Sequence, residues 1–350
     1  MNHDSSLESL SELVQFSPDA VVLVRNESIA YLNPAAQKLF RIQLTGAPMS
    51  QVMPGLDLRC SNGPYAASVT VMGVSCQANV QLWNGVTLLT LRRQTPPAPV
   101  PPAVIRALRA SATELRFSLD RISPDQPEED VSRMYHSYYS LLHSIEQLTD
   151  RNQVAKNELF CRNDYVDMRK LIKELSSSLE YYLPERTASL TCHLSDGLSI
   201  VLGDRDRLEQ LLLILLSNAL RHAPPDGHVR LSLHSTWNRC VVFVEDDGPG
   251  LSDADMAEVF LPRMDDEKPS ASGSGLGLYI AQGITRACSG TLMLENLPKK
   301  GVRVTLSLPL KDVLLLRDAP GGKWIHSPRR ILTELSDLLP SQAYRREDLE

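Results

Sequence analysis

The chain has 350 residues, enough for two or three domains with a core each, and its 43% hydrophobic and 22% charged residues are typical of a globular protein. A net charge of −6 speaks against a nucleic-acid binder, which usually carries a basic face, and no run of about eighteen apolar residues exists to form a membrane span. The acidic, amphipathic first residues are unlike a signal peptide, and the six cysteines lack metal-site spacing, so we expect a cytoplasmic protein with reduced thiols.

Residues 1–93 are predicted to mix short strands with short helices. The predicted strands cover 20–24, 29–32, 67–72, 76–83 and 86–92. Helical spacing follows at Asn33–Phe40, with Pro34 suited to the first turn, and Asn84-Gly85 is a strong hairpin signal. The order of these elements predicts a compact α/β module.

This module resembles the PAS sensor domain family. The resemblance rests on the order of the elements and on the stretch SPDAVVLVRNESIAYLNPAAQKLF at residues 17–40. It implies a sensor that either binds a ligand or only dimerises and relays a signal. The sequence shows no haem or flavin signature, which favours the relay. We therefore expect a PAS-like sensor domain at residues 1–93.

Residues 94–102 are rich in proline and predict an extended, semi-rigid linker. Residues 103–156 are then predicted to form a two-helix hairpin, because apolar residues recur at alternating steps of three and four on both sides of a polar break. The seam positions are Ile105, Leu108, Ala112, Leu115, Leu119 and Ile122, then Val131, Met134, Tyr138, Leu141, Ile145 and Leu148. One hairpin buries little apolar surface, whereas two form a four-helix bundle. The spacing therefore predicts a homodimer held through residues 103–150.

From residue 157 to residue 310 the pattern predicts an α/β domain. Asp167 and Asp204 are predicted N-caps of two helices, and glycines open a third helix at 275–288. The predicted strands cover 187–194, 198–202, 228–234, 239–245, 291–295 and 302–308. Alternation of this kind predicts a sheet with helices packed on it.

An asparagine stands among leucines at the end of the second helix, in Leu-Leu-Ser-Asn218-Ala-Leu-Arg221-His222. A buried amide costs free energy without a partner, and its oxygen is the kind of ligand that Mg²⁺ prefers. Arg221 has the charge to meet phosphates, and His222 would line the same pocket or pack beside it. Alone, the pattern also fits a helix-terminal asparagine satisfied by the backbone.

A second motif, Asp246-Asp-Gly248-Pro-Gly250, directly follows a predicted strand. A carboxylate at Asp246 could accept the adenine amino proton, and the glycines leave room for a planar ring. Alone, this pattern is also a common turn.

A third motif, Gly273-Ser-Gly275-Leu276-Gly277-Leu278, opens a predicted helix. Glycines let the backbone wrap around phosphates, and a helix N-terminus supplies N–H donors. The motif does not follow a strand within a βαβ unit, so it is not a dinucleotide-binding fingerprint.

The order Asn218, Asp246-x-Gly-x-Gly, Phe260, Gly275-Leu-Gly and a late glycine, Gly301, resembles the GHKL ATP-binding superfamily. That superfamily holds histidine kinases, gyrase-type enzymes, Hsp90-type chaperones and MutL-type repair proteins. The preceding hairpin and the lack of a following transducer domain make this chain most similar to the histidine kinases. The resemblance implies an α/β sandwich, a mixed sheet with helices on one face, that binds Mg-ATP under a lid at 261–272. The implied ATP contacts are Asn218, Arg221, His222, Asp246, Gly248, Gly250, Gly273, Gly275, Leu276, Gly277 and Leu278, with Asn218 also the metal ligand.

Two positions depart from the pattern of the family. Ile214 stands one helical turn before Asn218, where many relatives carry a first asparagine, and this removes a metal or phosphate contact. Arg263 replaces a second phenylalanine soon after Phe260. We expect ATP to bind but turnover to be slow.

The first hairpin helix contains Thr113-Glu114-Leu-Arg-Phe-Ser-Leu, which resembles the histidine kinase motif H-E-L-R-T-P-L. Thr113 occupies the position of the phosphoacceptor histidine, and Glu114 that of its neighbouring base. An imidazole attacks phosphorus readily near neutral pH, whereas a threonine hydroxyl is a poor nucleophile whose phosphoester is too stable for onward relay. We therefore do not expect histidine autophosphorylation in this helix, and a Thr113 phosphoester formed with Glu114 as base stays open.

Two other histidines, His136 and His143, lie on the second hairpin helix outside the seam. We expect them to be solvated surface residues rather than substitute acceptors. The tail, residues 311–350, carries one amphipathic segment and no other signal. The apolar members of that segment are Ile331, Leu335 and Leu338.

The leading interpretation is an α+β multidomain signalling protein of the histidine kinase family, with a PAS-like sensor, a dimerisation hairpin and an ATP-binding domain that takes ATP and Mg²⁺. Its expected partners are a second copy of the chain and a response regulator or another signalling protein of a two-component system. Two alternatives stay open. One is a GHKL kinase that phosphorylates a serine or threonine hydroxyl on itself or a partner, and the other is a pseudokinase scaffold gated by ATP without catalysis.

Overall fold

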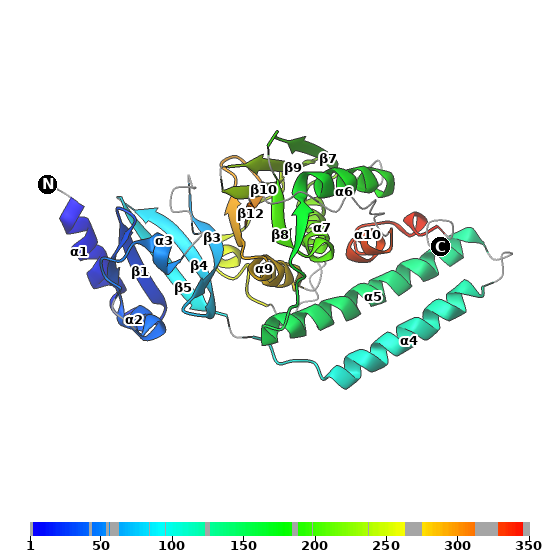
Figure 1. The fold of residues 1–350 in the computed structure, drawn as a ribbon, viewed down its shortest axis with the longest axis horizontal. Helices are drawn as coiled ribbons and strands as arrows, with labels where there is room; N and C mark the ends of the chain where they lie inside the picture. The colour runs from blue at the N-terminus through cyan, green and yellow to red at the C-terminus, as the bar shows by residue number, and fades with distance from the viewer. Residues whose placement is uncertain are drawn as a thin grey trace. The chain divides into compact units, whose positions relative to one another are not determined.

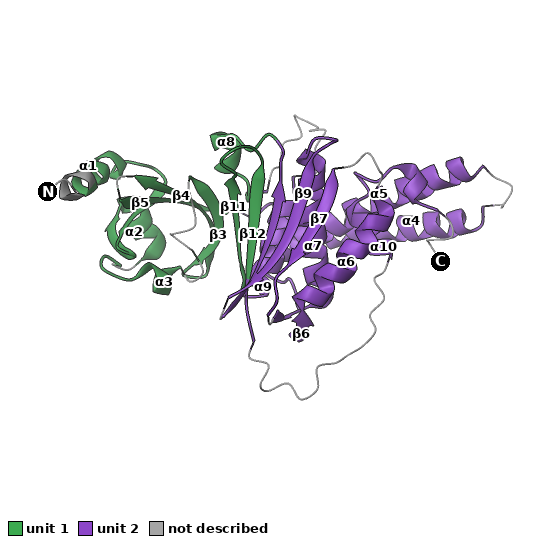
Figure 2. Ribbon diagram, turned by 90° about the horizontal axis from the view of Figure 1, so that it is seen from above, with its two compact units in different colours: residues 1–95, 249–261, 290–307 green, residues 96–248, 262–289, 308–350 purple. Residues whose placement is uncertain are grey.

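The computed structural model describes residues 3–41, 44–53, 56, 63–83, 85–94, 96–122, 127–183, 188–197, 199–236, 238–262, 275–311 and 328–345. The chain forms two compact units, shown in different colours in Figure 2. The first unit comprises residues 1–95, 249–261 and 290–307, and the second comprises 96–248, 262–289 and 308–350. Both units mix helices with strands, which confirms the predicted α+β class. The domain boundaries given above stay a prediction.

The first unit is built on one antiparallel sheet with the strand order β2-β1-β5-β4-β3-β11-β12. The strands are β1 Ala20–Arg25, β2 Ser28–Leu32, β3 Tyr65–Val71, β4 Val74–Trp83, β5 Val86–Arg93, β11 Thr291–Asn296 and β12 Val302–Pro309. The helices of this unit are α1 His3–Val14, α2 Pro34–Phe40, α3 Met49–Val52 and α8 Asp253–Met256. The predicted strands of residues 1–93 are thus confirmed, whereas α1 and α8 were not foreseen.

Helix α2 begins where the sequence predicts, and a buried asparagine explains why. The Asn33 side chain accepts hydrogen bonds from the backbone N–H groups of Ala36 and Val21, each at 2.9 Å. Its amide donates to the carbonyl oxygen of Asp19 at 2.9 Å. One side chain therefore caps α2 and ties it to the start of β1, which a proline at the first helical position could not do alone.

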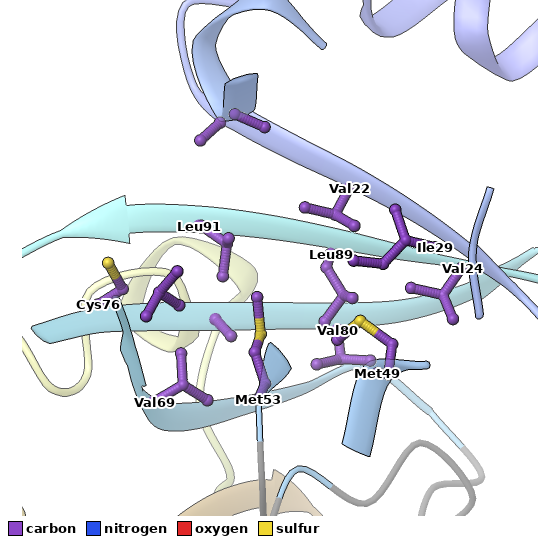
Figure 3. Close-up of a cluster of buried hydrophobic side chains, with 14 of the residues drawn as sticks. Val22, Val24, Ile29, Met49, Met53, Val69, Cys76, Val80, Leu89 and Leu91 are labelled. Atoms are coloured by element: carbon purple, nitrogen blue, oxygen red, sulfur yellow. The ribbon is translucent and has the colours of Figure 1, made fainter. Parts of the chain in front are cut away.

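The core of the first unit lies between its sheet and α2 and α3. Figure 3 shows the labelled side chains of this cluster, which come from the five strands β1 to β5 and from α3 and the residue after it. They are Val22, Val24, Ile29, Met49, Met53, Val69, Cys76, Val80, Leu89 and Leu91. Because aliphatic and sulfur-containing side chains are buried together here, hydrophobic burial stabilises the module.

Strand β3 also pairs with β11, a segment more than two hundred residues later in the chain. The register joins Ala67 to Met293 and Tyr65 to Glu295 in an antiparallel ladder. Alternation of apolar and polar residues predicts a strand but not its neighbour, because pairing partners are chosen by the packing of the whole fold.

Two buried glutamines hold a turn of the same unit in place. The Gln77 amide on β4 donates to the Met256 carbonyl oxygen at 2.9 Å and accepts from the Phe260 N–H at 3.1 Å. The Gln94 amide donates to the Phe260 carbonyl oxygen at 3.2 Å. Side chains of the N-terminal strands thereby satisfy backbone groups of residues 256–260, which belong to no strand.

Replacing Gln77 with methionine is expected to lower the free energy of unfolding by about 2–6 kcal/mol. Methionine keeps the volume, but it leaves a buried N–H and a buried carbonyl oxygen without partners, at about 1–3 kcal/mol for each such group. Urea unfolding of the full chain measures the loss. Gln81→Met, at an exposed position of the same strand, is the control and should change stability by less than about 0.5 kcal/mol. Equal midpoints for the two variants would contradict this account.

In the second unit, α4 Pro102–Asp120 and α5 Glu128–Lys156 form the expected pair of helices, which lie side by side in Figure 1. The linker before them is fastened to α5. Asn152 accepts from the Val100 N–H at 3.0 Å and donates to the Val100 carbonyl oxygen at 2.7 Å. Arg151 donates to the Ala98 carbonyl oxygen at 2.8 Å. The proline-rich stretch is therefore anchored at two points.

The rest of the second unit is a mixed sheet covered by helices. The strands are β7 Ser189–Leu194, β9 His228–Ser235 and β10 Arg239–Asp246, and a separate pair is formed by β6 Asp164–Asp167 and β8 Ile200–Gly203. β7 runs parallel to β9 and β10 runs antiparallel to it, as a mixed sheet requires. The helices are α6 Met168–Tyr182, α7 Arg205–His222 and α9 Gly277–Ala287. Asp167 and Asp204 cap α6 and α7 as predicted, whereas β6 was not foreseen.

The last elements that the structure describes are α10 Pro328–Glu334 and a short 3₁₀ turn, η2 Ser341–Ala343. The predicted amphipathic segment is confirmed, since Ile331 and Leu335 are fully buried. Among the described residues, no helix has the length and apolar character needed to cross a membrane.

Candidate nucleotide-binding site

The first and second sequence motifs meet at the end of α7. Asp246 is the buried last residue of β10, and its Oδ1 accepts a hydrogen bond from the Gly248 N–H at 2.8 Å. A Cβ atom added to Gly248 would lie 2.7 Å from that oxygen and 2.7 Å from the His222 carbonyl oxygen. The close approach therefore requires glycine, and it brings the Asp246 turn against the last turn of α7.

The third motif meets the first one turn earlier on α7. A Cβ atom added to Gly277 would lie 3.2 Å from Ile214 Cγ2 and 3.8 Å from Asn218 Nδ2. Helix α9 thus begins in contact with the face of α7 that carries Asn218. Gly275 has a positive φ of 64°, and the cap residue Leu276 has no polar side chain with which to bond the first N–H groups of α9.

The asparagine itself is half-buried, while most of α7 around it is buried. Its amide therefore reaches the surface beside the start of α9, where an oxygen could meet a metal ion or a ligand. The described residues contain no cluster of three or more histidine, cysteine or acidic ligands.

A carboxylate oxygen next to Asp246 is left without a partner. Within the described residues, Asp247 Oδ1 is buried and accepts no hydrogen bond. A Cβ atom added to Gly227 would lie 2.4 Å from this oxygen, so the turn before β9 closes over it. A buried acceptor of this kind is normally satisfied by water, a ligand or an ion. The motif alone does not single out Asp247, because the neighbouring Asp246 is the residue that defines it.

Arg221, on the last turn of α7, is paired inside the protein. Its guanidinium donates to the Asp337 carboxylate at 3.1 Å. Neither the spacing of the motif nor the composition of the tail indicated this pair. His222, by contrast, is exposed.

Gly250 lies in the first unit and is held by an asparagine of β11. It has a positive φ of 82°, and an added Cβ would lie 3.2 Å from Asn296 Oδ1. The same Asn296 accepts from the Leu251 N–H at 2.8 Å and donates to the Leu251 carbonyl oxygen at 2.8 Å. Both the backbone conformation and the crowding therefore require glycine here. Gly273, Arg263 and most of the predicted lid lie outside the described residues.

Thr113 and Glu114 are both exposed on α4. The Thr113 hydroxyl donates to the Arg109 carbonyl oxygen at 2.8 Å, one turn back along its own helix. In this arrangement the proton of the hydroxyl is directed at the backbone and not at the Glu114 carboxylate. A nucleophile needs a base within hydrogen-bonding reach of its proton.

The expectation that His136 and His143 are solvated is wrong. His143 is buried, and His136 Nε2 lies 2.8 Å from the Ser336 carbonyl oxygen. Both residues do point away from the seam, but the C-terminal residues cover that face of α5. Periodicity identifies a face of a helix and says nothing about a third segment that covers it.

Comparison with known proteins agrees with the motifs. Residues 203–312 match the family described as histidine kinase-, DNA gyrase B- and HSP90-like ATPase. Adaptive-response sensory kinase SasA of Thermosynechococcus vestitus is 29% identical over 206 residues, which are 56% of this chain and 53% of the relative. Signal transduction histidine-protein kinase BaeS of Escherichia coli is 29% identical over 210 residues, 59% of this chain and 44% of the relative. The chain thus spans about half the length of these relatives. The solved structure of the Acinetobacter baumannii histidine kinase AdeS aligns with a TM-score of 0.44 at 21% identity, over 59% of this chain and 98% of that one.

Proposed function

We propose that this chain is a member of the sensor histidine kinase family and that its second unit binds Mg-ATP where α7 meets the Asp246 turn and the start of α9. The observation that supports this most is the pair of close approaches, Gly248 against His222 and Gly277 against Ile214 and Asn218. They bring three motifs, separate in the sequence, to two neighbouring turns of one helix.

Each group has a role that follows from its chemistry. Asp246 accepts the adenine amino proton, and the absence of a Cβ at Gly248 keeps the base pocket open. The N–H groups at Gly275–Leu278 and the Arg221 guanidinium bind phosphates. The Asn218 oxygen orients the metal ion, and Mg²⁺, when bound, neutralises charge on the phosphates.

The output of this site is proposed to be a change of conformation passed to a partner, not a phosphohistidine. Thr113 holds the acceptor position, and its hydroxyl proton is bonded to a backbone carbonyl oxygen. A second candidate function, phosphorylation of a serine or threonine hydroxyl, needs that bond to break so that the proton can pass to Glu114 as the oxygen attacks the γ-phosphorus and ADP leaves. Both side chains are exposed, so this alternative is open to test, and the acid stability of a phosphoryl label distinguishes it from a phosphohistidine.

Replacing Asp246 with asparagine tests the site directly. We expect the affinity of the full chain for Mg-ATP to fall by about 1–3 kcal/mol, or roughly 5- to 150-fold, because a charge-assisted hydrogen bond to adenine is lost. Titration calorimetry measures the change, with Asp226→Asn, an exposed acid on the turn after α7, as the control. A parent chain that shows no affinity at millimolar Mg-ATP would refute the proposed function.

The hairpin is proposed to dimerise, and the burial of its seam supports this. In a heptad that counts Ile105 and Val131 as position a, the a residues Ala112, Leu119, Tyr138 and Ile145 are buried. The d residues Leu115, Met134 and Leu141 are 39%, 47% and 37% exposed. One half of the seam is therefore used within the chain, and the other half is left for a second hairpin.

We also propose that residues 1–93 act as a PAS-like relay and that a response regulator or a similar signalling protein is the partner. The buried apolar cluster between the sheet and α2 and α3 supports a folded α/β module of this kind, and the role of a relay rests on the resemblance in sequence. The identity of the partner rests on membership of the family alone.

A further inference from the structure

The C-terminal segment, residues 328–345, packs along α5 and α7 within the second unit (Figure 1). Its apolar side chains are almost completely removed from water. They are Ile331, Leu332, Leu335, Leu339 and Tyr344. At about 25 cal/mol per Å² of apolar surface, burial on this scale fixes a short segment firmly in one place.

On the side of the hairpin, this segment covers both histidines of α5. His136 Nε2 lies 2.8 Å from the Ser336 carbonyl oxygen, and its ring lies 5.0 Å from that of Tyr344. The Tyr344 hydroxyl donates to the Leu332 carbonyl oxygen at 2.8 Å, which closes the segment on itself. Neither His136 nor His143 is presented to a nucleotide while the segment is docked.

A buried polar cluster lies at the centre of this contact. Glu334 Oε2 is 3.7 Å from His143 Nδ1, and burial raises the pKa of Glu334 to about 8, with Glu146 and Asp150 adding to the rise. Burial also lowers the pKa of His143. At neutral pH the two groups are therefore both uncharged, and the contact is a polar one between neutral side chains rather than an ion pair.

On the side of α7, the segment reaches a residue of the nucleotide site. Asp337 pairs with Arg221 at 3.1 Å, and the Arg221 side chain is only 17% exposed. Arg330 donates to the Asp206 carbonyl oxygen near the other end of the same helix. The Asp337 carboxylate is therefore already paired with the Arg221 guanidinium, the group that is proposed to bind the phosphates.

We propose that the C-terminal segment is an autoinhibitory strap that holds α5 against α7 and competes with nucleotide phosphates for Arg221. The inference rests on the proposed Mg-ATP site. A guanidinium paired with Asp337 must exchange that partner for a phosphate, so docking of the strap and binding of ATP oppose each other. Because such coupling is reciprocal, the strap weakens ATP binding by the same factor by which ATP loosens the strap.

The test compares Asp337→Asn with the parent chain by titration calorimetry with Mg-ATP. Asp337 is partly exposed, so the variant should fold, and the removal of an ion pair of this kind should tighten ATP binding about threefold. Asp226→Asn, which removes an exposed carboxylate beyond the end of the same helix, is the control and should leave the affinity unchanged.

A second measurement reads the strap itself. Amide hydrogen exchange at residues 331–336 should become faster in the parent chain when Mg-ATP is added, and should not respond in Asp246→Asn at the same ATP concentration. The strap proposal is wrong if Asp337→Asn binds Mg-ATP no more tightly than the parent and if hydrogen exchange at residues 331–336 does not respond to ATP. That result would leave the proposed ATP site unaffected. A failure of every variant to bind ATP overturns the proposed function, and the strap with it.

Discussion

A Thr113→His variant is expected to gain an acid-labile phosphoryl label from γ-labelled ATP that the parent chain does not acquire. Thr113 is exposed on α4 beside Glu114, so an imidazole can be introduced there without disturbing the buried seam residues Ala112 and Leu119. The unprotonated ring nitrogen would attack the γ-phosphorus, the proton on the other ring nitrogen would pass to the Glu114 carboxylate, and ADP would leave. Proximity supplies much of the remaining reduction of the activation barrier to phosphoryl transfer. The lack of a nucleophile is therefore enough to explain why the parent chain would acquire no label.

The lability of the label separates the alternatives. Phosphohistidine is lost in acid, whereas phosphothreonine and phosphoserine survive acid and are lost in base. An acid-stable label on the parent would favour the hydroxyl kinase over an ATP-gated scaffold. Ser111→His places an imidazole at another exposed position of α4, two residues before Thr113 and so on the opposite side of the helix from it, and should stay unlabelled.

Two results would contradict this prediction. A parent that already forms phosphohistidine would mean that His136 or His143 becomes accessible, although the C-terminal segment covers both. A folded Thr113→His variant that binds ATP and stays unlabelled would show that Ile214 and Arg263 disable transfer as well.

Local signals in the sequence predicted most of the helices and strands. Asp167 and Asp204 cap α6 and α7 as expected, because an aspartate at the N-cap bonds the first free N–H groups wherever the helix lies in the fold. The apolar seam of the hairpin was also predictable from the sequence, because its heptad spacing depends only on the geometry of one helix. These signals act over a few residues and need no knowledge of partners.

What the sequence did not disclose depends on contacts between distant segments. Nothing local says that β3 pairs with β11, or that Gln77 satisfies the backbone at Met256 and Phe260. A glutamine within a largely apolar strand was the available clue to the second of these, because a buried amide costs free energy without partners.

In the candidate site, too, some features were predictable from the sequence and others were not. The motifs that carry Asn218, Asp246 and Gly277 were identified from residue types and order, and the structure brings their segments together on α7. The pairing of Arg221 with Asp337 was not identified, because an aspartate in a weakly patterned tail carries no sign of its partner. Only the folded chain reveals that a predicted phosphate contact is already occupied.

Placing aspartate at both Leu115 and Leu141 is expected to convert the proposed dimer into a folded monomer. Each leucine is more than one-third exposed in the single chain, so a carboxylate at either position keeps its contact with water and leaves the hairpin intact. In a four-helix bundle the same positions are enclosed, and an uncompensated buried charge costs about 3–5 kcal/mol. Two such charges in each chain should raise the dissociation constant by at least about a hundredfold.

Sedimentation at micromolar concentration measures this change, and circular dichroism checks that the variant keeps its helices. Ala110→Asp together with Ser144→Asp adds the same charge to exposed positions outside the seam and should remain dimeric. The control matters because added negative charge alone weakens association of a chain whose net charge is already −6. If the parent sediments as a monomer, the exposed d positions have another partner, and the bundle inferred from the heptad spacing does not form from two copies of this chain.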